Sequence, residues 1–315
     1  MKKAARIQLL DRKRSRNVLI ALSSIRAPVK DIVTAISRME WDCVSVEVLE
    51  RILTIFPSDE ELELVTSYGG NVEVLAKPEK FFLLLSQDPK INSKIRWMLF
   101  HSELGAVSDA LEGSLNELIN ALNTLLTSNE LRRFLLTVLQ VGNYMNSDTS
   151  NANAYGFKMQ SLLSLRMIKS SDRRSNLLLF VASFMEHQGG SMRELAKDLQ
   201  CVVAGSRVEY AHICNEINRF RQALSSMRAY QFRLEEKKND DERVIRRLGD
   251  VIAEASPRLR QIEALRAQVQ DRWRSIREKF PMDDVGEDLK AGDLAVWVEL
   301  SKHVQLLASG SKITS

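Results

Sequence analysis

The side chains that could carry out catalysis are few and scattered. Four histidines are spread along the chain: His101, His187, His212 and His303. None belongs to an HExxH pair or lies at metal-ligand spacing from a cysteine. The sequence has no Gly-x-Ser-x-Gly elbow, and Gly69-Gly70 is not followed by the Lys-Ser/Thr pair of a phosphate-binding loop. We therefore expect no catalytic residue, no metal and no cofactor, and an enzyme is the least favoured class of function.

The cysteines and the lengths of the apolar runs indicate the cellular compartment. Cys43, Cys201 and Cys214 are odd in number and follow no spacing pattern, which fits reduced thiols in cytoplasm. The first six residues, Met1 to Arg6, do not form a secretory signal. No apolar run approaches the roughly 18 residues that a membrane helix needs. The sequence predicts a cytoplasmic protein without a membrane span.

Composition and periodicity predict an all-α fold. The 315 residues include only 6 prolines and 13 glycines, which favours long helices. Ser58-Asp-Glu-Glu61 is a capping box, and Ser128 begins another helix. The polar stretch from Gly142 to Phe157 predicts a loop. Strand signals are nearly absent, so we expect an elongated or two-lobed helical body. The net charge of +4 is small beside 45 basic and 41 acidic residues and does not indicate nucleic acid as a partner.

The strongest periodic signal starts at Tyr210. Apolar residues alternate there in steps of three and four, as in the seam of a coiled coil. The first part of the seam contains Tyr210, Ile213, Ile217, Phe220, Leu224, Met227, Gln231 and Leu234. The second part contains Ile245, Leu248, Ile252, Ala255, Leu259, Ile262, Arg266, Val269, Trp273 and Ile276. The polar residues 237–242 and Pro257, which should kink or restart a helix, interrupt it. We expect an antiparallel helical arm.

Two segments together resemble a known family. The segment Leu139-Gln-Val-Gly-Asn-Tyr-Met-Asn146 is followed, after a polar loop, by Asn153-Ala-Tyr-Gly-Phe-Lys-Met-Gln-Ser-Leu-Leu-Ser-Leu165. This pair strongly resembles the signature of the formin homology-two domain. Upstream, residues 10–22 are similar to the start of that domain's knob, and the heptads lie where the family carries its coiled-coil arm. The match is looser from Arg272 on, where Phe280-Pro-Met-Asp-Asp284 stands in place of a Phe-Gly-Glu-Asp-like stretch.

The resemblance implies an all-α domain that binds actin at filament barbed ends and nucleates or processively elongates filaments. It implies a knob over residues 1–100, a post over 101–204, a coiled-coil arm over 205–280 and a C-terminal post helix over 281–315. In the family, two domains form a ring in which the N-terminal lasso of one wraps the post of the other. Nine residues precede Leu10, so we expect the chain to lack the lasso and to form the homodimer only when the lasso is present.

The resemblance also assigns residues. It places Ile20 as the apolar actin contact of the knob and Lys169 as a charged one. The lasso-receiving post would contain Gly142, Asn143, Tyr144, Met145 and Asn146. Each assignment has a plainer alternative, because Gly142 and Asn143 could simply end a helix, Ile20 could be a core residue, and Lys169 could be a solvated lysine.

The N-terminal segment is strongly basic. It contains Lys2, Lys3, Arg6, Arg12, Lys13, Arg14 and Arg16 against Asp11. Such a patch suits electrostatic steering toward acidic actin, and we assign Lys13, Arg14 and Arg16 to the actin contact. The patch could equally attract anionic lipid or RNA. The alternative function is a coiled-coil scaffold or tether whose formin-like body no longer assembles actin.

Overall fold

The computed structural model describes residues 6–150, 152–171, 173–236, 242–280, 286–290 and 292–309. Within these ranges the chain forms thirteen α-helices and two short 3₁₀ helices. β-Pairing in the same ranges is confined to two isolated bridges, Ile7–Leu75 and Lys169–Asn176. The predicted all-α class is confirmed. No helix in the described part of the chain is long and apolar enough to cross a membrane.

The chain divides into two compact units. The first contains residues 1–107 and 220–257, and the second contains residues 108–219 and 258–315. Three long helices contribute residues to both units: α6 (Ile91–Thr127), α11 (Tyr210–Glu236) and α12 (Glu242–Lys279). The division into knob, post and arm stays a prediction.

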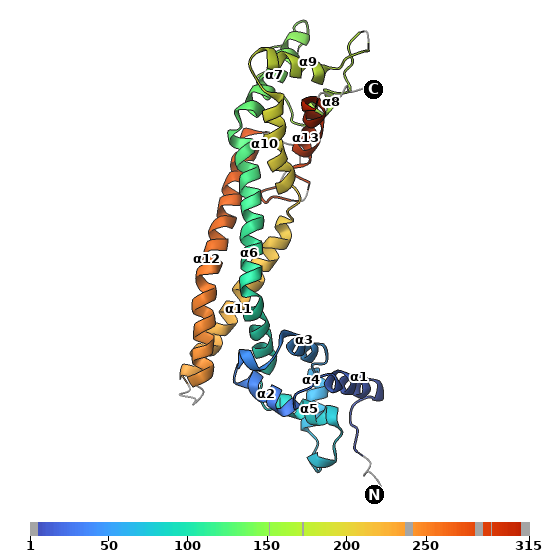
Figure 1. The fold of residues 1–315 in the computed structure, drawn as a ribbon, viewed down its shortest axis with the longest axis vertical. Coiled ribbons are helices and arrows are strands. Elements are labelled where there is room, and N and C mark those ends of the chain that lie inside the picture. Colours follow the sequence, from blue (N-terminus) through green and yellow to red (C-terminus); the bar gives the residue numbers. More distant parts are fainter. Residues whose placement is uncertain are drawn as a thin grey trace. The chain divides into compact units, whose positions relative to one another are not determined.

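The first unit contains a cluster of short helices around α5 (Figure 1). These elements are α1 (Arg12–Ser23), α2 (Val29–Ser37), η1 (Trp41–Cys43), α3 (Val46–Thr54), α4 (Asp59–Thr66), η2 (Val72–Val74) and α5 (Lys77–Ser86). The capping box at Ser58 and Glu61 is present and begins α4 as predicted. The buried carboxylate of Glu79, in the first turn of α5, accepts hydrogen bonds from the amides of Leu9 and Leu10 and so fixes the chain entering α1.

The predicted antiparallel arm is present in the first unit as the pairing of α11 with α12. The side-chain amide nitrogen of Gln231 lies 3.5 Å from the carbonyl oxygen of Ile245, and Arg228 Nη2 donates to Ser256 Oγ at 2.6 Å. Because the earlier residue of α11 meets the later residue of α12, the two helices run in opposite directions. The sequence did not reveal that α6 completes this arm as a third helix. The Trp97 Nε1 donates to Ser226 Oγ at 2.9 Å, and the ring packs against Tyr230 with centroids 5.4 Å apart.

The buried seam of α12 differs in phase from the predicted one. Val244 and Val251 are fully buried, whereas the predicted seam residues Ile245 and Ile252 are only half-buried. After Val251 the next buried residues are Ala255 and Leu259, each four positions further along. Two successive steps of four are the signature of a stutter in a heptad pattern. Pro257 lies between Ala255 and Leu259, and α12 continues through it without restarting. The polar residues 237–241, expected to interrupt the arm, lie outside the described residues.

The second unit contains the remaining helices. They are α7 (Asn129–Met145), α8 (Ser161–Ser164), α9 (Leu177–His187), α10 (Met192–Gly205) and α13 (Ala295–Ala308). Here α10 packs against α13 and α7 packs against α9 (Figure 1). Ser128 caps α7 as predicted, by accepting from the amide of Leu131 at 3.0 Å. The helix runs on to Met145, so the loop expected from Gly142 begins only at Asn146.

In this unit α6 and α12 run parallel and in register. Glu112 accepts from Gln261 at 2.8 Å and Asn123 accepts from Arg272 at 2.5 Å, each joining residues 149 positions apart. The constant separation means that the two helices advance together over these turns. Near their ends Lys279 donates to the carbonyl of Leu126 at 2.6 Å.

Candidate interaction surfaces

Helix α1 has an inward face and an outward face. Asp11 caps it by accepting from the amides of Lys13 and Arg14 at 2.9 and 3.3 Å. Val18 and Leu22 are buried. Ile20 is 59% exposed. The alternative that Ile20 is a core residue is therefore wrong.

The spacing of the basic residues decides which of them share the face of Ile20. Lys13, Arg16 and Ile20 are separated by three and then four positions, so they lie along one side of the helix, and all three are exposed. We call these three residues the α1 stripe. Lys2 and Lys3, also part of the predicted basic patch, lie outside the described residues.

Arg14 points the other way, along the side of Val18 and Leu22. Its Nε and Nη2 donate to the two carboxylate oxygens of Glu61 at 2.8 and 3.0 Å, and Nη2 also reaches the carbonyl of Phe56 at 2.9 Å. Burial alone would raise the pKa of Glu61, but the hydrogen bond and charge of Arg14, with the amide of Ser58, hold it below its ordinary value. Arg14 thus ties α1 to α4, while Lys13 and Arg16 face outward.

The segment from Gly142 to Asn146 forms the end of α7. Gly142 and Asn143 lie inside the helix and Asn146 caps it, so the alternative that Gly142 and Asn143 end the helix is wrong. Tyr144 is 83% exposed and Met145 is 54% exposed. The side chain of Asn143 instead holds the chain beyond the helix, through two hydrogen bonds of 2.9 Å to the backbone of Ala154.

An apolar groove of about 670 Å³ lies along α7. Leu135, Leu136 and Leu139 line one side, and Tyr155 and Phe157 belong to the segment that Asn143 holds. Sequence reasoning missed this groove. The signal was the recurrence of leucines every three to four residues on a side of α7 opposite its buried face, including Leu136, which is 50% exposed.

Charged groups border the α7 groove. Lys279 and Arg132 both line it. Burial, together with the positive charge of Arg132, lowers the pKa of the Lys279 ammonium. The groove is thus lined mainly by apolar side chains, with two cations among its lining residues.

Lys169 lies in the same unit as α7, on a short hairpin that precedes α9. Its backbone pairs with that of Asn176, and the amide of Leu177 donates to the carbonyl of Ile168 at 2.8 Å. The side chain of Lys169 is exposed. The structure therefore brings Lys169 and the Gly142–Asn146 segment into one unit, and it places the α1 stripe in the other.

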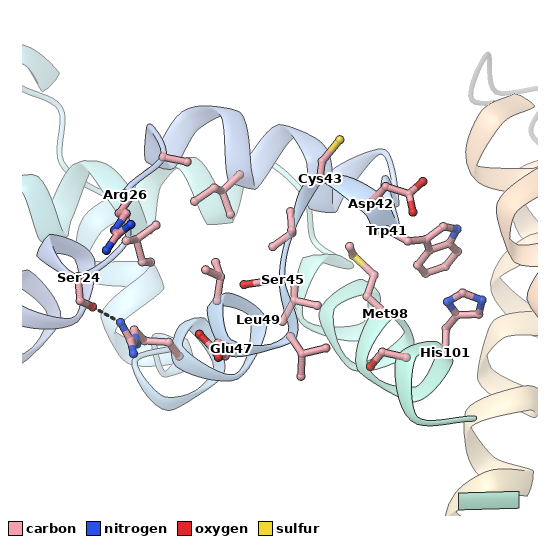
Figure 2. Close-up of a pocket in the computed structure, with 18 residues that line it drawn as sticks. Ser24, Arg26, Trp41, Asp42, Cys43, Ser45, Glu47, Leu49, Met98 and His101 are labelled. Atoms are coloured by element: carbon pink, nitrogen blue, oxygen red, sulfur yellow. Dashed lines mark hydrogen bonds between the residues drawn. The ribbon is translucent and has the colours of Figure 1, made fainter. Parts of the chain in front are cut away.

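A second groove, of about 790 Å³, lies in the first unit (Figure 2). Met98 and Leu49 contribute to its apolar wall, and the rings of Trp41 and His101 pack with centroids 4.7 Å apart and planes tilted by 32°. Figure 2 shows the Cys43 side chain pointing away from His101, so the groove does not bring together a thiol and an imidazole. No three His, Cys, Asp or Glu side chains gather as a metal site anywhere in the described ranges.

Comparison with known proteins identifies the family of the chain. The Formin Homology 2 Domain model matches residues 1–293. The chain is 28% identical over 225 residues to Formin-like protein 14 of Arabidopsis thaliana, covering 71% of the chain and 18% of that protein. It is 26% identical over 284 residues to Formin-like protein 7 of Oryza sativa subsp. japonica, covering 90% of the chain and 20% of that protein. The chain thus spans about a fifth of the length of these relatives, and it belongs to the Formin Homology 2 domain family.

Proposed function

We propose that the chain binds actin at the barbed ends of filaments and takes part in their nucleation and elongation through non-covalent contacts. The α1 stripe carries this proposal. It presents a large apolar side chain to water one turn beyond two exposed cations, while the opposite face of α1 is buried. An exposed apolar residue beside positive charge is the composition of an anchor with electrostatic steering.

Each residue of the α1 stripe has a role in this proposal. Ile20 supplies the contact area, because its removal from water on binding is favourable by about 25 cal/mol per Å². Lys13 and Arg16 raise the rate of encounter with an acidic surface, and this effect weakens as salt is added. Arg14 contributes indirectly, because its pairing with Glu61 fixes the helix that presents the other three.

Lys169 supplies a second actin contact in the proposal. Because the bridge to Asn176 fixes its backbone, the side chain projects from a defined point on the second unit. Two contacts on one chain bind more tightly than either alone, by up to about two to four orders of magnitude when geometry permits both.

The end of α7 is proposed as the surface that receives a lasso from a second copy. Tyr144 and Met145 are exposed there, and the α7 groove is an apolar site of a size that accepts a large side chain. When a lasso-bearing segment is joined to the N-terminus, we expect sedimentation velocity to show a dimer that Tyr144→Ser and Met145→Ser weaken. An undiminished dimer in both variants would place the receiving surface elsewhere.

A coiled-coil tether is the second candidate. The observation that favours it is the arm of α6, α11 and α12, whose buried seam includes Met227 and Leu248. A tether would fold identically but would leave actin assembly unchanged.

Two assays separate the candidates. In the first, the purified chain is pelleted with filamentous actin. In the second, elongation of barbed ends is followed with pyrene-labelled actin. We expect the chain to pellet with filaments and to change the elongation rate, and the tagged chain to localise with the actin cytoskeleton. No pelleting and no rate change would refute actin assembly and favour the tether.

A further inference from the structure

Helix α9 is apolar on two opposite sides. Leu178, Val181 and Met185 are buried on the side that faces the unit's interior. On the other side Phe180 is 54% exposed and Phe184 is 38% exposed. A helix that packs on one side only ordinarily presents polar residues to water on the other. The outer side of α9 therefore has the composition of a surface that a partner covers.

The two rings form a single platform. Phe180 and Phe184 are one helical turn apart, and their rings stack with centroids 6.1 Å apart and planes inclined by 11°. Because each phenylalanine has only two side-chain torsions and the rings support one another, little conformational entropy is lost when a partner binds.

The hairpin of Lys169 leads directly into the helix that carries the platform. The amide of Phe180 donates to the carbonyl of Asn176 at 3.2 Å, and Asn176 is the residue that pairs with Lys169. On the other side of the bridge, Met167 is 77% exposed and Ile168 is 43% exposed. Exposed apolar side chains thus both precede and follow the Lys169–Asn176 bridge along the chain.

The charges of the segment indicate the chemistry of the partner. Arg166, Lys169, Arg173 and Arg174 lie between residues 161 and 185, and the acidic residue in that interval is Asp172, which lies outside the described residues. Arg173 lies in the turn of the hairpin, with a left-handed φ of 58°. The segment therefore combines exposed apolar side chains with an excess of basic ones, which suits an acidic protein surface with an apolar patch.

The small area of the platform indicates that it is one of several contacts with a partner. Two aromatic side chains bury at most about 150–250 Å² each. A stable protein pair buries about 1,200 Å² or more, so this surface alone would not hold a second copy of the chain. It fits one contact of several made to a single partner.

We propose that Phe180 and Phe184 form the apolar part of a contact whose charged part is Lys169, and that the partner is the acidic surface of an actin subunit. This inference rests on the proposed function. It adds that the second unit binds actin through a defined aromatic anchor.

The test uses the double variant Phe180→Ser/Phe184→Ser, with Phe232→Ser as its control. Phe232 is 60% exposed on α11, in the first unit. Thermal melting first establishes that each variant is folded. In filament pelleting we expect the double variant to bind actin about tenfold more weakly or worse and the control to bind like the wild type. Unchanged binding by a folded double variant would overturn the proposal.

A single variant keeps the test decisive if the double variant does not fold. Phe184→Glu places a helix-favouring, water-compatible carboxylate against the acidic partner, and we expect about tenfold weaker binding or worse. Wild-type affinity in this variant would overturn the proposal. A wild-type chain that does not bind actin would instead refute the proposed function on which it rests.

The competing partner is an anionic membrane. Pelleting with vesicles of phosphatidylcholine and phosphatidylserine distinguishes it. We expect the double variant and the wild type to behave alike with these vesicles. If the double variant lost vesicle binding but kept actin binding, the platform would be a lipid contact and the proposal would be wrong.

Discussion

The side chain of Asn143 and the backbone of Ala154 are joined by two hydrogen bonds of 2.9 Å. The amide nitrogen of Asn143 donates to the carbonyl of Ala154, and the amide oxygen accepts from the Ala154 N–H. This clasp joins the last turn of α7 to the segment that contains Tyr155 and Phe157, which line the α7 groove. The asparagine in the resemblance motif therefore shapes the groove while its neighbour Tyr144 remains exposed.

Removing this clasp should loosen the groove and leave α7 intact. Asn143→Asp retains an acceptor but loses the donor to Ala154, and it places a carboxylate beside a carbonyl oxygen. We expect a loss of about 1–3 kcal/mol in the free energy of unfolding. We also expect faster proteolytic cleavage between residues 146 and 155. Asn146→Ala, one turn later at the exposed helix end, is the control. It should neither lower the free energy of unfolding nor speed cleavage. Equal cleavage of both variants would contradict a structural role for Asn143.

Ile20→Ala should separate binding from folding. Because Ile20 is exposed, we expect the melting temperature to stay unchanged. The loss of an apolar anchor should weaken binding to filament ends by about 2 kcal/mol or more if Ile20 is a hot spot. Val18→Ala, on the buried side of the same helix, should instead lower the melting temperature by removing core volume. Barbed-end elongation assays beside thermal melting provide both measurements. Wild-type elongation by the Ile20 variant would refute its assignment.

Lys169→Asp should weaken actin binding most at low salt. The change replaces attraction with repulsion at an exposed site, and salt screens that difference over about 10 Å at 0.1 M. The fold should be unaffected because only the backbone of Lys169 pairs with Asn176. The measurement is filament affinity at several salt concentrations. A difference from the wild type that did not shrink with added salt would argue against a charged contact.

The Arg14–Glu61 pair should make stability depend on pH in acid. The pKa of Glu61 is lowered in the folded chain, so the unfolded chain takes up this proton more readily. The stabilisation is therefore present above the ordinary carboxylate pKa and is lost as pH falls through the lowered value. Glu61→Gln should lower stability at neutral pH and reduce the acid-dependent loss. The measurement is chemical unfolding between about pH 3 and pH 7, and an unchanged pH profile would refute the pair's role.

Ile217→Asp should test the seam of α11. Ile217 is fully buried, and an unpaired carboxylate there should open the helices locally or unfold the domain. Asn215→Asp, on an exposed side of the same helix, is the matched control and should melt like the wild type. If both variants melted alike, the seam would not be a source of stability. Gln231→Leu, at a half-buried seam position, should hold or raise stability.

Interactions between residues close in sequence were sufficient to predict the helices and some of their ends. The capping box of Ser58 and Glu61 and the cap at Ser128 involve neighbours within three residues, so the sequence could predict them. The all-α class followed because breakers are few and the apolar period is helical almost throughout. The family followed from two segments whose residue order is specific.

Tertiary structure decided what the apolar faces and charged groups contact. The role of Arg14 depends on Glu61, 47 residues away, and α6 meets α12 through residues 149 positions apart. The phase of α12 depends on which of two neighbouring residues, Val244 or Ile245, faces the other helices, and a repeat of apolar residues permits both. Periodicity reports that a helix has an apolar side, but the choice of partner is a long-range property. The exposure of Ile20 and of the Phe180–Phe184 pair also depends on the tertiary structure. The sequence shows that these residues are apolar, but only the packing of the other elements determines which apolar residues stay exposed.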